Sequence, residues 1–154
     1  AVYCGADPPR SVERTAVRGP EHADPATLER MLVDLVNRDR AAVGLAGLRE
    51  DPELGRVARS HTQDLAARQV VEHVSATTGS AADRVRAAGV AATLVLENVA
   101  RATSVTEAER SFMTSPGHRA NVLARAVDRI GVGVAVVPGP GGLRAVYVTQ
   151  VFAR

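Results

Sequence analysis

Two histidines and one glutamate lie in surroundings that suit residues doing chemistry. His73 follows the end of a helical segment and leads into a Ser/Thr/Gly loop, and His118 lies in the turn Ser-Pro-Gly-His-Arg. Glu97 interrupts an apolar strand, where an unpaired carboxylate is costly, so it needs a partner. Residues at the ends of elements can point into a shared cleft. Two imidazoles and a carboxylate can bind a divalent metal or share protons, and we expect the three residues to converge in one cleft.

The same residues have plainer interpretations. Their spacing is not that of a compact metal motif such as H-E-x-x-H, so a purely structural, hydrogen-bonded cluster stays equally open on chemistry alone. The two remaining histidines carry less information. His61 lies on the apolar stripe of a helix, where we expect a half-buried imidazole bonded to a neighbour, and His22 lies in a polar arm, where we expect it to be solvated.

The composition predicts one domain that does not bind nucleic acid. A chain of 154 residues can bury a proper core, and with 3% aromatic residues that core must consist of Val, Leu and Ala. All 19 basic residues are Arg, scattered among 17 acidic ones, and the net charge is +2. Cys4 is the only cysteine, so an intrachain disulfide is excluded, and Tyr3 before it disfavours lipid attachment. No apolar run is long enough to span a membrane, and residue 1 does not open the apolar region of a signal peptide.

Cap residues and helical periodicity define the elements that must position these side chains. Residues 1–24 show no sustained period and are expected to form an N-terminal arm or linker, so the domain is expected over 25–154. Asp, Ser and Pro at helix starts, and Gly at helix ends, mark the predicted helices. These begin after Asp24, Asp51 and Ser80, the first ends at Gly44 and the third at Gly89, and residues 104–114 form another.

The strands are expected mainly in the second half of the chain. Thr93–Ala100 is rich in β-formers, and Ile130–Val136 alternates Val with Gly and Ala before a Pro-Gly-rich turn and a second strand over Ala145–Phe152. This pattern predicts an antiparallel hairpin with small residues on one face, where a helix could pack closely. The order of elements favours an α/β fold with helices on both faces of a mixed or antiparallel sheet.

Several blocks, in this order, resemble one known family. The chain is similar to the bacterial SCP-like branch of the CAP superfamily (cysteine-rich secretory proteins, allergens and pathogenesis-related proteins) over about residues 28–152. The most specific block runs from Ser115 to Leu123. The other matching blocks are Asn37–Leu48 with its LVNxxRxxxGLxxL pattern, Ala58–Leu65, Val71–Ser75, Asp83–Gly89, Leu96–Ala100, Phe112–Met113, Ile130–Gly133 and Tyr147–Phe152.

The resemblance implies a three-layer α-β-α sandwich in a secreted or cell-envelope protein, with a cleft lined by two histidines and one or two acids. It assigns His73 and His118 as the two histidines, which in some relatives hold zinc or another divalent ion, and Glu97 as the acid. Leu96 stands where the family usually has Gly. Its larger side chain would crowd the backbone near the cleft. The second acid of many relatives is missing. We hypothesise that Glu109, which lies on the inner stripe of its helix, substitutes for it. The alternative is a glutamate tolerated at the edge of that stripe.

Three functions are consistent with these residues. The first is a secreted, non-catalytic and monomeric binding module for a metal ion, small ligand, lipid or envelope component. The second is a peptidase-like hydrolase that uses His73 or His118 as a general base, or a metal-activated water, with Glu97 orienting the imidazole. The third is a structural envelope protein. We favour the binding module because no nucleophile is evident, since we expect the Ser115 hydroxyl to cap a helix.

Overall fold

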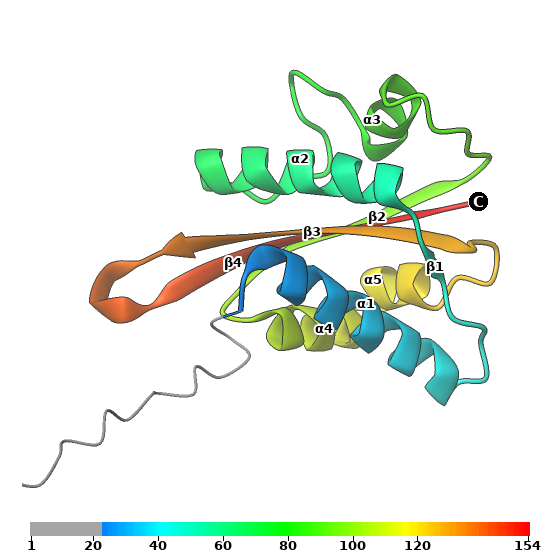
Figure 1. The fold of residues 1–154 in the computed structure, drawn as a ribbon, viewed down its shortest axis with the longest axis horizontal. Coiled ribbons are helices and arrows are strands. Elements are labelled where there is room, and N and C mark those ends of the chain that lie inside the picture. Colours follow the sequence, from blue (N-terminus) through cyan, green and yellow to red (C-terminus); the bar gives the residue numbers. More distant parts are fainter. Residues whose placement is uncertain (1–22) are drawn as a thin grey trace, which may run out of the picture.

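Residues 23–154 are described by a computed structural model, in which helices cover both faces of a four-stranded sheet (Figure 1). The expectations for the N-terminal arm, His22 and Cys4 fall on residues 1–22 and lie outside the described residues. The helices are α1 (Pro25–Ala42), α2 (Pro52–Arg68), α3 (Ala81–Ala87), α4 (Val105–Thr114) and α5 (Pro116–Val122). The strands are β1 (Arg49–Glu50), β2 (Val95–Ala102), β3 (Arg129–Pro138) and β4 (Arg144–Ala153), with a short 3-10 turn, η2 (Pro140–Gly142), in the β3–β4 connection.

The helix starts lie where the sequence predicts them, because cap residues satisfy the backbone N–H groups of each first turn. Asp24 accepts a hydrogen bond from the Thr27 N–H, Asp51 caps α2, and Ser80 forms a capping box at α3. One expectation was wrong. Ser115 occupies the N-cap position of α5, but its side chain makes no capping hydrogen bond.

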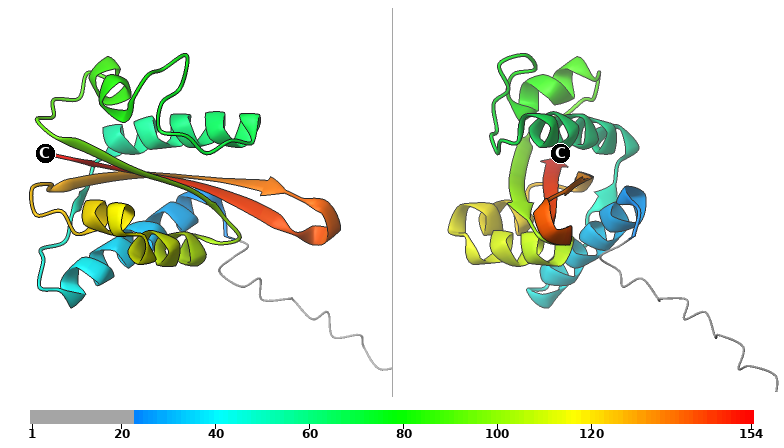
Figure 2. Two further views of the ribbon diagram at one scale, coloured as in Figure 1. Left: turned by 180° about the vertical axis from the view of Figure 1, so that it is seen from behind. Right: turned by 90° about the vertical axis from the view of Figure 1, so that its left-hand side faces the viewer.

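The sheet is mixed, with strand order β1-β3-β4-β2. The short β1 runs parallel to β3, while β3–β4 and β4–β2 are antiparallel, so the predicted C-terminal hairpin is confirmed. Helices α2 and α3 lie on one face, and α1, α4 and α5 lie on the other (Figure 2). These layers form the expected three-layer α-β-α sandwich. The core is aliphatic on both faces, with Phe112, Tyr147 and Phe152 as its largest aromatic members.

Two glycines of β3 allow α2 to pack directly on the sheet. A Cβ atom at Gly131 would lie 2.1 Å from the Leu54 carbonyl carbon, and one at Gly133 would lie 2.5 Å from the Arg59 nitrogen. Both distances are far below van der Waals contact, so even alanine would push the helix away. The small face predicted for the hairpin therefore accommodates α2.

A buried acid covers part of the free edge of β3. The strand β1 pairs with Arg129 and Ile130, and within residues 23–154 no strand pairs with the rest of this edge. Glu29 of α1 reaches over it and accepts a hydrogen bond from the Val134 N–H at 3.3 Å. Its other oxygen pairs with Arg59 of α2 at 3.0 Å, so this one carboxylate joins both helical layers around the sheet edge.

Candidate functional site

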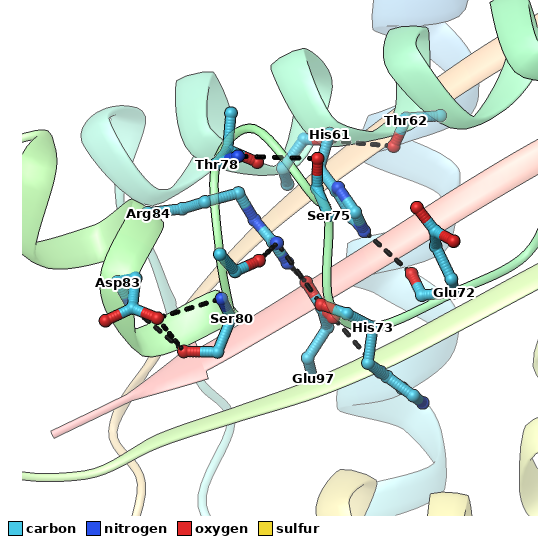
Figure 3. Close-up of polar contacts among 12 residues, drawn as sticks. His61, Thr62, Glu72, His73, Ser75, Thr78, Ser80, Asp83, Arg84 and Glu97 are labelled. Atoms are coloured by element: carbon cyan, nitrogen blue, oxygen red, sulfur yellow. Dashed lines mark hydrogen bonds and ion pairs between the residues drawn. The ribbon is translucent and has the colours of Figure 1, made fainter.

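His73 and Glu97 are in direct contact at the β2 side of the sheet. Nδ1 of His73, in the loop after α2, lies 3.0 Å from Oε1 of Glu97 on β2 (Figure 3). The Glu97 side chain is only 4% exposed, whereas the His73 side chain is 54% exposed. Because a carboxylate accepts hydrogen bonds, Nδ1 carries the proton. The other ring nitrogen, Nε2, points away from Glu97 (Figure 3).

Arg84 is the second partner of Glu97, a role that was not predicted from the sequence. One guanidinium N–H₂ group donates to Oε2 of Glu97, and both side chains are almost fully buried. The other terminal nitrogen donates to the backbone carbonyls of His73 at 3.2 Å and Gly79 at 2.7 Å. Arg84 therefore fixes the loop that carries His73 as well as the acid that orients its ring. The signals in the sequence are its place in the matching block Asp83–Gly89 and its position beside Val85, which is buried on α3.

His61 lies outside this contact but close to it. Its Nε2 bonds to the Glu72 carbonyl oxygen at 2.9 Å, so Nε2 donates the proton and Nδ1 is the unprotonated nitrogen. The residue is only 2% exposed, so the expected hydrogen bond is present but the ring is buried rather than half-buried. Burial lowers the pKa of His61, and the charges of Glu97 and Arg84 act on it in opposite directions. The ring thus supports residue 72, the neighbour of His73.

His118 is the third residue of α5, so it lies in a helix rather than in the preceding turn. Its ring packs edge-on against Phe112, with centroids 5.1 Å apart. Burial lowers the pKa of His118, and the charge of His73 lowers it further. The two imidazoles are therefore near enough to interact electrostatically, although they come from opposite helical layers.

Asn98 secures the His118 side of the site. Its side-chain amide donates to the His118 carbonyl oxygen at 3.1 Å and to Oε1 of Gln150 at 3.0 Å, and its oxygen accepts from Asn121. The Asn121 amide also donates to the Glu97 carbonyl oxygen at 3.1 Å. Successive side chains of a strand point to opposite faces. Glu97 therefore anchors the layer of α2 and α3, and Asn98 anchors the layer of α4 and α5.

Glu109 is buried on α4 but does not hydrogen-bond to either imidazole. Its Oε2 accepts from the Gln150 amide at 2.6 Å, and its Oε1 has no hydrogen-bond partner among the described residues. Burial raises its pKa to about 7, and the nearby carboxylate of Asp39 on α1 contributes to this rise. Among the described residues, hydrogen bonds thus link Glu109 to the site through Gln150 and Asn98. The inner stripe of α4 was predicted correctly, whereas the role of Glu109 as a second cleft acid stays a prediction.

The residues around Glu97 fit a metal ion poorly. Both carboxylate oxygens are engaged, one by His73 and the other by Arg84, and the guanidinium charge would repel a divalent cation. Within residues 23–154, no group of three or more His, Cys, Asp or Glu side chains is arranged to hold a metal. His73 and His118 remain as two possible ligands, so the expectation of zinc stays a prediction without Glu97 as a third ligand.

Known proteins are similar to this chain in sequence and in fold. In curated sequences, the chain is 31% identical over 126 residues to the uncharacterised protein YkwD of Bacillus subtilis, covering 81% of this chain and 49% of that protein. It is 33% identical over 109 residues to the uncharacterised membrane protein YlbC of the same organism, covering 70% and 32%. The chain thus spans half or less of the length of these relatives.

Solved structures agree in fold. An extracellular protein of Bacillus anthracis containing an SCP domain matches with a TM-score of 0.75 and 28% identity, covering 84% of this chain and 41% of that one. An outer surface protein of Borrelia burgdorferi matches with a TM-score of 0.69 and 18% identity, covering 81% and 91%, which supports the fold alone. Residues 33–152 match the profile of the cysteine-rich secretory protein family. The chain therefore belongs to this family, the CAP superfamily.

Proposed function

We propose that this CAP domain is an extracellular binding module in which His73 and His118 together hold a small oxyanion, such as a carboxylate or a phosphate. An extracellular setting is supported by the Bacillus anthracis relative, whose structure is described as an extracellular protein. Within residues 23–154, no helix has both the length and the apolar character needed to cross a bilayer.

The hydrogen bond from His73 Nδ1 to Glu97 is the observation that carries the proposal. It fixes the ring and leaves Nε2 as the nitrogen presented to a ligand. Arg84 balances the charge of Glu97, so this pair presents no net negative charge that would repel an oxyanion. In the proposed complex the bound oxyanion accepts one hydrogen bond from Nε2–H of the imidazolium form of His73 and a second one from the His118 ring.

A second candidate is a hydrolase, and the same hydrogen bond favours it. A histidine oriented by a carboxylate can remove a proton from water or from a nucleophile. Among the described residues, however, the side-chain hydrogen bonds of the imidazoles go to Glu97 and to the Glu72 carbonyl oxygen, and none joins a hydroxyl group. Binding therefore requires no group beyond those already described, whereas catalysis would also require a nucleophile or a water molecule next to an imidazole.

Histidine-selective ¹⁵N NMR of the full chain tests the proposal, with inorganic phosphate, acetate and Zn²⁺ as separate probes. We expect saturable shifts of His73 Nε2 with phosphate or acetate, and at least tenfold weaker binding in His73→Gln and in His118→Gln. His22→Gln is the matched control, because it removes an imidazole that is not part of the pair. Shifts with Zn²⁺ only would replace the proposal with a metal site. The proposal also fails if no probe shifts His73, or if a broad peptide library is hydrolysed only while His73 is present.

A further inference from the structure

A cavity of about 620 Å³ lies on the other side of Arg84 from His73. Helices α2 and α3 and the loop between them form its walls, and Figure 3 shows Thr78 and Asp83 beside Arg84, on the side away from His73. Its volume falls within the range of small-molecule pockets. It is lined by Glu53, Arg56, Val57, Ser60, Thr77, Thr78, Asp83, Arg84, Ala87 and Ala88.

The charges of the lining cancel. Glu53 pairs with Arg56, Asp83 pairs with Arg86 at the rim, and Arg84 pairs with Glu97 behind the wall. Such a lining offers no excess charge to attract an ion, so an ionic ligand would have to displace an existing partner. The pocket therefore suits a neutral molecule.

The uncharged part of the lining is rich in hydroxyls and poor in large apolar groups. Ser60 and Thr78 each offer a donor and an acceptor, whereas the Thr77 hydroxyl already shares a hydrogen bond with Ser75. The acids of the lining add acceptors and its arginines add donors. The apolar part consists of one valine, two alanines and the carbon stems of the longer side chains, with no large aliphatic or aromatic side chain against which an acyl chain could pack. A pyranose ring has the matching chemistry, because hydroxyls surround its edge and C–H groups form a small apolar face.

We propose that this pocket between α2 and α3 binds a neutral saccharide unit. The site is separate from the proposed oxyanion site, so either proposal can fail alone. The two sites share a wall, because Arg84 lines the pocket and also holds Glu97 and the carbonyl oxygen of His73. A bound saccharide would therefore rest against the side chain that positions the exposed imidazole.

Amide NMR of the ¹⁵N-labelled full chain tests this proposal with maltose and N,N′-diacetylchitobiose as neutral probes. We expect at least one of them to give saturable shifts centred on Val57, Ser60 and Ala87. Glucuronate serves as a charged probe and trialanine as a peptide probe, and both are expected to bind at least tenfold more weakly.

Two variants locate the binding. Ala87→Phe fills the pocket from the exposed surface of α3, and Ser60→Val removes one hydroxyl, so each is expected to weaken saccharide binding at least tenfold. Ala67→Phe adds the same bulk as the first variant at an exposed position of α2 outside the lining, and binding should be retained. The proposal is wrong if neither disaccharide gives saturable shifts. It is also wrong if trialanine or glucuronate binds as well, or if both pocket variants bind like the wild type.

Discussion

Arg84 and Glu97 form an ion pair whose side chains are only 6% and 4% exposed, and this pair holds the acid that orients His73. Arg84→Met would leave the Glu97 carboxylate buried with one partner fewer. We expect the free energy of unfolding, measured with urea, to fall by about 3–5 kcal/mol.

Arg86→Met on the same helix is the matched control, because Arg86 pairs with Asp83 in an exposed position and should contribute little. The double variant Arg84→Met/Glu97→Leu should recover part of the loss, since it removes the uncompensated charge. Equal effects of Arg84→Met and Arg86→Met would contradict the role given to the buried pair.

Gly133→Ala should destabilise the protein because its Cβ would overlap the backbone of α2. Overpacking of this kind costs about 1–3 kcal/mol, and backbone cannot move as easily as the end of a side chain. Thermal unfolding followed by circular dichroism measures the loss. Gly117→Ala is the control, since a Cβ there meets nothing within 4 Å. A stability of Gly133→Ala at or above that of the control would show that α2 does not pack as described.

Glu109 should make stability depend on pH between its ordinary pKa of 4.5 and the value of about 7 to which burial raises it. In this window the folded protein keeps a proton that the unfolded chain has released. The free energy of unfolding therefore falls as pH rises through the window, and it no longer depends on this group at higher pH. Glu109→Gln mimics the protonated acid and should remove this loss, so the variant should exceed the wild type by about 3 kcal/mol at pH 8.

The difference between Glu109→Gln and the wild type should disappear near pH 4, which urea unfolding across the pH range can check. Glu107→Gln on the exposed face of α4 should behave in the opposite sense, because hydrogen bonds from Thr103 lower the pKa of Glu107. A stability gap for Glu109→Gln that is the same at pH 4 and pH 8 would refute the assignment.

Asn98→Asp should weaken the contact between β2 and α5. The acid cannot donate to the His118 carbonyl oxygen or to Gln150, and it places a charge at a fully buried position. We expect a loss of about 2–4 kcal/mol, since two buried acceptors lose their donor. Gln63→Glu makes the same chemical change at an exposed position of α2 and should be nearly neutral. Similar urea midpoints for the two variants would argue against the network.

Local features were predicted well because their causes lie within a few residues. The caps at Asp24, Asp51 and Ser80 act on the following turn, and the Val/Gly alternation of β3 follows from the two-residue period of a strand. The need of Glu97 for a partner was also evident from its apolar flanks. The sequence did not show that Arg84 would be one of those partners. An ion pair between α3 and β2 depends on how the two elements are positioned relative to each other in the fold.

The position of Glu109 illustrates the same limit. Helical periodicity placed it correctly on the inner stripe of α4, but it could not say which buried group the carboxylate would meet. That depends on the face of β4 that carries Gln150 and on the packing of α1, which brings Asp39 close. Both are tertiary relationships, so no local pattern encodes them.

The carboxylate of Glu29 covers part of the free edge of β3, and this position affects whether the protein can self-associate at high concentration. An uncovered strand edge is a template on which a second chain can add its own strand and begin an aggregate. A strand arriving at Val134 would have to displace Glu29 from the N–H group and separate it from Arg59. We therefore expect Glu29→Val to uncover this part of the edge and to self-associate at a lower protein concentration than the wild type.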